Sequence, residues 1–142
     1  MGTSTAGIAH AALVADILNK PMGYVRGSNK SHGRQNRIEG AVREGMKVVV
    51  VEDLISTGGS SLEVVDALRE AGCEVLGLVA IFTYGLKDSI KNFADKDCHF
   101  VTLSNYDALL PVAVEHNYIK EEALEKLKAW KVDPHDESWM TK

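Results

Sequence analysis

Residues 48–61 read VVVVEDLISTGGSS: four valines, two acids, a Leu-Ile pair and a loop of small and hydroxyl-bearing residues. A continuous apolar run of this kind is expected of a central parallel strand with both faces covered. In open α/β sheets ligands bind at the carboxyl ends of the strands, and the acids and the loop would lie at such an end. The stretch therefore predicts an α/β fold with a ligand site directly after this strand.

The loop that follows the acids has the composition of a phosphate-binding loop. Its residues are Ser56, Thr57, Gly58, Gly59 and Ser60. The glycines would let backbone N–H groups approach a phosphate, and the helix predicted to follow adds positive potential at its N-terminus. Acids beside an anion site indicate that the ligand also carries hydroxyl groups or Mg²⁺, as a phosphorylated sugar does. An Asp-led turn before a capped helix is the alternative, and the string matches neither the Walker loop nor the Rossmann fingerprint.

Outward from this stretch, short β-branched runs alternate with helical windows, which is the pattern of βαβ units around a mostly parallel sheet. Strands are predicted at residues 22–26, 46–52, 74–82 and 98–103. Helices are predicted at residues 6–19, which are apolar on nearly every side and so indicate a buried helix, at 61–71, at 86–94, and towards residues 116 and 130. Pro111 is tolerable only near the first turn of its helix. We expect one domain over residues 1–131 and a loose polar tail over 132–142.

Two further segments are candidates for binding an anion. Residues 2–7, GTSTAG, are small and hydroxyl-rich, although a helix N-cap alone would explain them. Residues 27–40, GSNKSHGRQNRIEG, are polar and basic, which is typical of a solvated loop or of a flexible lid over a phosphorylated ligand. The basic side chains of this loop are Lys30, His32, Arg34 and Arg37. Of these, His32 could exchange protons near neutral pH.

Composition excludes several classes of protein. The 142 residues carry a net charge of -4, which argues against a general nucleic-acid surface. The longest apolar run, residues 75–82, is far short of the roughly 18–20 residues that span a bilayer, so no membrane partner is expected. The only two cysteines, Cys73 and Cys98, match no zinc or disulfide framework and fit a cytoplasmic location.

Together these motifs resemble the type I phosphoribosyltransferases, most closely the branch that acts on orotate. The string at 48–61 is similar to the family's signature for binding phosphoribosyl diphosphate. The orotate branch is indicated by GTSTAGIAHAA, by PMGYVR followed by KSHG and IEG, and by IFTYGL and TLSNYDALL. The resemblance runs from about Gly2 to Trp130. It implies a Rossmann-like core, a mostly parallel sheet flanked by helices, with a flexible catalytic loop.

The resemblance also implies roles for individual residues. The positions that would bind phosphoribosyl diphosphate are Arg26, Lys30, His32, Glu52, Asp53, Leu54, Ile55, Ser56, Thr57, Gly58, Gly59 and Ser60. Of these, Lys30, His32 and Asp53 would be catalytic. The acids Glu52 and Asp53 would face the ribose hydroxyls, the loop 56–60 would hold the 5′-phosphate, and Ser56 would also touch orotate. The pyrophosphate loop would consist of Thr3, Ser4, Thr5 and Ala6.

The function implied is transfer of a phosphoribosyl group to orotate, with Mg²⁺ carried by the substrate and no direct metal ligand on the protein. Lys30 and the loop before Ala6 would stabilise the leaving pyrophosphate, and His32 could protonate one of its oxygens. The resemblance also implies a homodimer in which the mobile loop reaches the neighbouring subunit's site. Three alternatives stay open: an enzyme for another base, a non-catalytic sensor of phosphoribosyl diphosphate that regulates genes through RNA, and an inactive relic that keeps the fold. The acidic net charge counts against RNA.

Two departures from the family's pattern have consequences. Gly27 stands where some members have a second basic residue, so one charge contact would be lost. Members also carry an additional helical segment and the first core strand ahead of the position of Gly2. Without these we expect unpaired sheet edges and association. We also expect turnover and orotate affinity to fall more than the binding of phosphoribosyl diphosphate.

Overall fold

The computed structural model describes residues 1–27 and 37–137, which form a mixed, mostly parallel sheet flanked by helices. The strands are β1 (Gly2–Thr3), β2 (Tyr24–Val25), β3 (Ile38–Glu39), β4 (Lys47–Ile55), β5 (Glu74–Thr83) and β6 (Phe100–Asn105). The helices are α1 (Ala6–Ile17), α2 (Gly59–Glu70), α3 (Lys87–Asp95), α4 (Tyr106–Glu115) and α5 (Leu124–Val132), with a 3₁₀ turn η2 at Glu121–Ala123. The predicted α/β class is confirmed.

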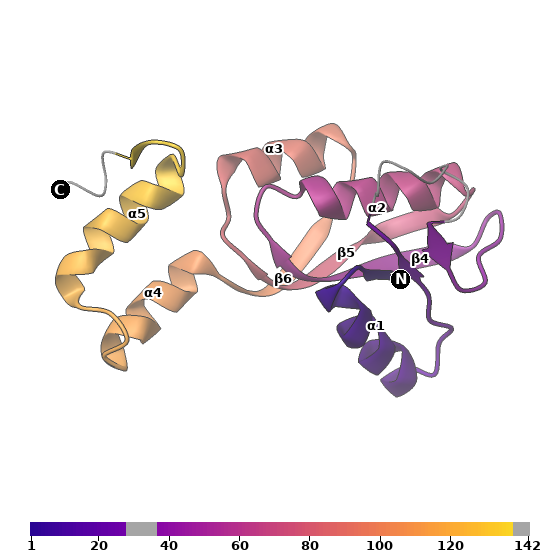
Figure 1. Cartoon of the computed structure of the whole chain (residues 1–142), viewed down its shortest axis with the longest axis horizontal. Coiled ribbons are helices and arrows are strands. Elements are labelled where there is room, and N and C mark those ends of the chain that lie inside the picture. The colour runs from indigo at the N-terminus through magenta and orange to yellow at the C-terminus, as the bar shows by residue number, and fades with distance from the viewer. Residues whose placement is uncertain (28–36, 138–142) are drawn as a thin grey trace.

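The sheet has the order β3-β2-β1-β4-β5-β6, and β2–β3 is its antiparallel pair. Helices α2 and α3 cover one face of the sheet, α1 lies on the other, and α4 and α5 extend beyond the β6 end (Figure 1). Because β1, β2 and β4 run parallel, their carboxyl ends meet at one edge. This edge is where the predicted site segments begin.

The core lies between the sheet and the layer formed by α2 and α3. Leu62, Val65 and Leu68 lie on one side of α2 and are buried with Val48 and Val50 of β4 and with Leu78 of β5. From α3, Phe93 is buried and its ring lies 4.5 Å from that of Phe100 on β6. These buried side chains hold α2 and α3 on the sheet.

The strands differ from the prediction in three places. Strand β4 continues through both acids to Ile55, because β5 pairs with it as far as Ile55 and Thr83. Strand β3 lies in the segment predicted to be a loop and pairs with β2. Strand β1 is only two residues long, yet it lies between β2 and β4 and pairs with both. The expectation that no strand leads into the loop before Ala6 is therefore wrong.

The helices differ from the prediction in two places. In α1, Gly7 and Ala11 are the buried residues, whereas Ile17 is 80% exposed, so the prediction of a buried helix is wrong. The buried residues of this helix are both small. Pro111 is the sixth residue of α4 rather than a first-turn residue. Among the described residues, no helix is both long and apolar enough to span a bilayer.

Candidate functional site

Three segments that are distant in the sequence come together at the carboxyl ends of β1, β2 and β4. Ser4, just after β1, donates its backbone N–H to the Val25 carbonyl at 3.2 Å. Its side-chain Oγ accepts a hydrogen bond from the Gly27 N–H at 2.7 Å. Val51 of β4 donates its N–H to the Met1 carbonyl at 2.8 Å. The predicted pyrophosphate loop and the start of the basic segment are therefore neighbours of the strand that leads into the predicted phosphate loop.

The predicted phosphate loop is a tight connection between β4 and α2. Ser56 and Thr57 are exposed, and Gly58 adopts a left-handed conformation with φ of 83° immediately before α2. No side chain caps the first turn of α2, so the orphan N–H groups there are free of side-chain acceptors. Such a helix N-terminus attracts an anion through its N–H groups and its dipole.

Helix α3 supports this loop from behind. The Asn92 amide donates from Nδ2 to the Thr57 carbonyl at 3.0 Å. A Cβ atom on Gly58 would lie 2.5 Å from Cε2 of Phe93, so the ring closes that side of the loop. At this position glycine is required by the protein's own packing and backbone conformation, and not only by the approach of a phosphate.

The predicted pyrophosphate loop also leads into an uncapped helix. Thr5 precedes α1 and makes no side-chain capping bond, and Ser4, Thr5 and Ala6 are exposed. Thr3 differs from them because it is buried and its hydroxyl points into the protein. A Cβ atom on Gly7 would lie 2.5 Å from the Val51 carbonyl oxygen, so α1 packs directly on β4. Two helix N-termini, those of α1 and α2, thus begin at the same edge of the sheet.

The two acids have different surroundings. Glu52 is only 6% exposed, and its carboxylate accepts hydrogen bonds from the hydroxyls of Thr3 and Ser61. Burial raises the pKa of the Glu52 carboxyl, and a hydrogen bond with the Asp53 side chain adds to the rise, while Thr3 and Ser61 oppose it. Asp53 is half-buried and donates its N–H to Glu52 Oε1 at 3.1 Å. Of the two, Asp53 is the acid with the more accessible side chain.

The remaining predicted site residues fall into two groups. Arg26 forms an ion pair with Glu39 at 3.3 Å, and its backbone pairs with Arg37, which in turn lies 3.6 Å from Glu63. Leu54 is 36% exposed, whereas Ile55 is fully buried in the core. The residues Lys30, His32 and Arg34 lie outside the described part of the chain. The catalytic and binding roles assigned from the sequence stay predictions.

A model of the family described as "Phosphoribosyl transferase domain" matches residues 1–117. The chain belongs to this phosphoribosyltransferase family. The match begins ahead of β1 and continues beyond α4, so it includes every segment of the candidate site.

Individual relatives agree with the family. The orotate phosphoribosyltransferase of Bacillus pumilus is 62% identical over 139 residues, which are 98% of this chain and 66% of that protein. That of Bacillus subtilis is 55% identical over 141 residues, which are 99% of this chain and 65% of that protein. This phosphoribosyltransferase chain therefore spans about two thirds of the length of these relatives.

Solved structures show the same fold. The orotate phosphoribosyltransferase of Aeropyrum pernix matches with a TM-score of 0.69 and 31% identity over 82% of this chain and 63% of that one. The UMP synthase of Leishmania donovani matches with a TM-score of 0.75 and 28% identity over 92% of this chain and 28% of that one. The predicted Rossmann-like phosphoribosyltransferase core is confirmed.

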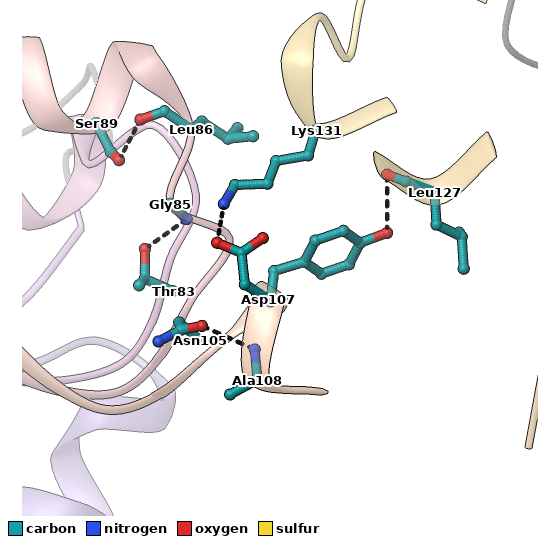
Figure 2. A network of polar contacts seen from close by, with 10 residues as sticks. Thr83, Gly85, Leu86, Ser89, Asn105, Asp107, Ala108, Leu127 and Lys131 are labelled. Atoms are coloured by element: carbon teal, nitrogen blue, oxygen red, sulfur yellow. Dashed lines mark hydrogen bonds and ion pairs between the residues drawn. The ribbon is translucent and has the colours of Figure 1, made fainter. Parts of the chain in front are cut away.

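The motifs IFTYGL and TLSNYDALL lie at the carboxyl ends of β5 and β6, and their residues make several of the contacts in Figure 2. Thr83 Oγ1 accepts from the Gly85 N–H at 3.0 Å, and Asn105 Oδ1 caps α4 by accepting from the Ala108 N–H at 3.0 Å. Lys131 of α5 donates to Asp107 of α4 at 2.5 Å. Asn105 thus joins the end of β6 to the start of α4, and Lys131 joins α5 to α4.

The sequence did not predict which buried and neighbouring side chains hold the site residues in place. Asn92 gave no signal, because a lone amide on a helix surface is ordinary. Phe93 was predicted as an apolar helix residue, but its position under Gly58 depends on how α3 lies on the sheet. Ser61 was predicted only as the start of a helix, and Thr3 was predicted as part of the pyrophosphate loop. The structure shows instead that both hydroxyls donate to Glu52.

Replacing Glu52 by glutamine is expected to change the pH dependence of stability. Burial raises the pKa of this carboxyl above its ordinary 4.5, so the native protein holds a proton that the unfolded chain releases first. The contribution of Glu52 to the free energy of unfolding is therefore fully present when the pH is below the pKa of this carboxyl in the unfolded chain. It is lost as the pH rises through the higher pKa of the carboxyl in the native protein. In urea unfolding, the free energy of wild type minus that of Glu52→Gln should fall as pH rises above 4.5.

Glu115→Gln, an exposed change of the same kind at the end of α4, is the matched control for that measurement. A wild-type minus Glu52→Gln difference that stays constant or rises with pH would contradict a Glu52 pKa that burial raises.

Proposed function

We propose that this phosphoribosyltransferase transfers the phosphoribosyl group of phosphoribosyl diphosphate to orotate, producing orotidine 5′-monophosphate and pyrophosphate in pyrimidine biosynthesis. The bond from the anomeric carbon to the diphosphate oxygen breaks, and a bond from that carbon to a ring nitrogen of orotate forms. The observation that carries this proposal is the 62% identity to an orotate phosphoribosyltransferase over 98% of this chain.

The two helix N-termini fit the two phosphorylated ends of this donor. The 5′-phosphate would be held by the N–H groups and hydroxyls of residues 56–60, where α2 begins without a side-chain cap. The diphosphate would lie against residues Ser4, Thr5 and Ala6, where α1 also begins without one. Both ends are reached from one edge of the sheet, as a single ligand requires.

Asp53 would contact the ribose hydroxyls between these two ends. Its carboxylate is more accessible than that of Glu52, whose oxygens accept bonds from Thr3 and Ser61. In the described part of the chain, no group of three His, Cys, Asp or Glu residues could hold a metal ion. In this proposal Mg²⁺ arrives with the diphosphate of the substrate.

Catalysis in this proposal rests on positioning and charge stabilisation. The departing diphosphate gains charge, and Lys30 of the basic segment would neutralise it while His32 donates a proton to one of its oxygens. Arg26 and Arg37 pair through their backbones and so hold the two ends of that segment together. Exclusion of water by the segment would protect the activated sugar from hydrolysis.

The protein would act as a homodimer in which the two subunits share their active sites. It would be located in the cytoplasm. Its two cysteines are free and buried, which is consistent with a reducing compartment. A phosphoribosyltransferase for another base is the second candidate, because adenine phosphoribosyltransferases share the fold: that of Leishmania donovani matches with a TM-score of 0.63 at 20% identity. The similarity to orotate enzymes is much higher and favours orotate.

The test is an assay of this chain with Mg²⁺, phosphoribosyl diphosphate and a panel of bases, with calorimetry of donor binding and sedimentation velocity for the dimer. Of the bases in the panel, we expect only orotate to give a nucleotide product. Asp53→Asn should weaken donor binding about 10- to 100-fold, because a hydrogen bond to a charged group contributes about 1.5–3 kcal/mol. Its unfolding should be unchanged.

Asp16→Asn removes an equivalent charge from an exposed position on α1 and is the matched control, so its donor binding should equal that of wild type. Product with adenine or hypoxanthine instead of orotate would favour the second candidate. Donor binding without any product would favour a sensor, and no donor binding would contradict the proposal as a whole.

A further inference from the structure

One buried carboxylate connects the two anion loops. Glu52 of β4 accepts at Oε1 from the hydroxyl of Thr3, and at Oε2 from the hydroxyl of Ser61 at 2.8 Å. Thr3 is the last residue of β1 and the first residue of the predicted pyrophosphate loop. Ser61 lies in the first turn of α2, directly after the predicted phosphate loop. The three residues come from three elements, and the carboxylate is the group they share.

Because these hydrogen bonds are buried, water cannot replace either partner. Thr3 is 3% exposed and Ser61 is 1% exposed, so neither hydroxyl can exchange its partner for bulk water. The Thr3 hydroxyl has a single hydrogen and could otherwise donate only to the Val51 carbonyl, which lies at 3.3 Å. A buried carboxylate that loses a donor keeps the cost of its desolvation. Each loop is therefore tied to one oxygen of a rigid group.

The side chains of Thr3 and Ser61 point towards Glu52 and not towards the exposed loop residues. A role in direct contact with a ligand is thus assigned to their neighbours, such as Ser4 and Ser60, which are exposed. Through Glu52, Thr3 and Ser61 connect the starts of α1 and α2.

We propose that Thr3 and Ser61 are positioning residues that, through Glu52, set the spacing between the pyrophosphate loop and the phosphate loop. This inference rests on the proposed function, because it takes a donor with a phosphate at each end as the ligand. A two-ended ligand requires both loops at the correct separation, whereas a ligand with one phosphorylated end requires one loop only. The spacing should therefore matter for the whole donor and not for its halves.

Calorimetry in the presence of Mg²⁺ tests this with phosphoribosyl diphosphate, ribose 5-phosphate and inorganic pyrophosphate. Thr3→Val keeps the shape of the side chain and removes the hydroxyl. It should weaken the whole donor about 10- to 100-fold, because a two-ended ligand loses affinity when its two sites can no longer be engaged at once. The two half ligands should change by less than about threefold, within ordinary context effects. Thr3→Ser restores the hydroxyl and should restore donor affinity.

Ser61→Ala should show the same split between whole and half ligands. Ser60→Ala, on the exposed neighbour, is the matched control: it should weaken ribose 5-phosphate and the whole donor equally. Equal losses for all three ligands in Thr3→Val, or a failure of Thr3→Ser to rescue, would overturn the positioning role.

A ligand-free measurement separates this inference from the proposed function. In urea unfolding, the shift of the midpoint in the double variant Thr3→Val, Ser61→Ala should differ from the sum of the single shifts, because both hydroxyls act on one carboxylate. In a Glu52→Gln background that deviation should shrink. Additive shifts would overturn the linkage even if the donor binds. A clear deviation in a protein that binds no donor would refute the proposed function and leave the structural linkage standing.

Discussion

Replacing Gly58 by alanine is expected to lower the free energy of unfolding by about 2–5 kcal/mol. The left-handed backbone at φ of 83° costs a residue with a Cβ atom about 1–2 kcal/mol. The new Cβ would also lie 2.5 Å from the Phe93 ring. That ring is 1% exposed and packs on Phe100, so it cannot move away freely, and overpacking of this kind costs about 1–3 kcal/mol. Urea unfolding followed by circular dichroism measures the loss.

Two glycines separate the contributions to this effect. Gly45 has a φ of 72° with nothing within 4 Å of its Cβ position, so Gly45→Ala should show the backbone cost of about 1–2 kcal/mol alone. Gly59 has space for a Cβ atom, whose nearest neighbour would be Thr57 Oγ1 at 4.0 Å. Gly59→Ala should therefore keep stability and report only the approach of a phosphate. A Gly58→Ala variant as stable as Gly45→Ala would refute the contact with Phe93.

This pair of glycines shows what the sequence could and could not predict. The order of strand, acids and glycine loop was enough to predict a phosphate loop at the end of a central strand, and β4 and α2 have that arrangement. It was not enough to distinguish the two glycines. Gly58 faces a ring 35 positions further along the chain, and this proximity depends on how α3 packs on the sheet.

The acids show the same limit. Alternation along β4 determines that Glu52 and Asp53 point to opposite faces, but β4 was predicted to stop at the first of them. Only the pairing of β4 with β5 as far as Ile55 shows that both lie within the sheet. The hydroxyl of Thr3, 49 positions away, then meets Glu52 because β1 lies beside β4.

The short strands mark a different limit. The strands β1, β2 and β3 have two residues each; β2 lies within the strand predicted at residues 22–26, whereas β1 and β3 offer no apolar run long enough to be a signal. Strand β1 forms because β2 and β4 both offer it hydrogen-bonding edges, so its conformation is set by tertiary pairing. The apolar composition of α1 likewise predicted burial, whereas the helix contacts the sheet through Gly7 and Ala11.

Replacing Gly7 by alanine is expected to destabilise the protein by about 1–5 kcal/mol, although alanine favours a helix over glycine by about 1 kcal/mol. The added Cβ would lie 2.5 Å from the Val51 carbonyl oxygen and 2.2 Å from Thr3 Oγ1. The carbonyl belongs to a central strand and cannot move, so α1 must shift, at an overpacking cost of about 1–3 kcal/mol. The displaced hydroxyl would leave buried Glu52 short of a donor, which costs about 1–3 kcal/mol more.

Ala12→Gly, at an exposed position in the middle of α1, measures helix preference alone and should cost about 1 kcal/mol. Gly27→Ala, whose Cβ would lie 3.8 Å from Ser4 Oγ, measures a glycine change in the same region without overlap and should be close to neutral. Thermal and urea unfolding of the three variants decide between packing and preference. If Gly7→Ala were as stable as wild type or more stable, helix preference would dominate and α1 could not be packed on β4 as closely as described. A large loss in Gly7→Ala alone would mean that the close packing of α1 on β4 is what requires glycine in the second position of this helix.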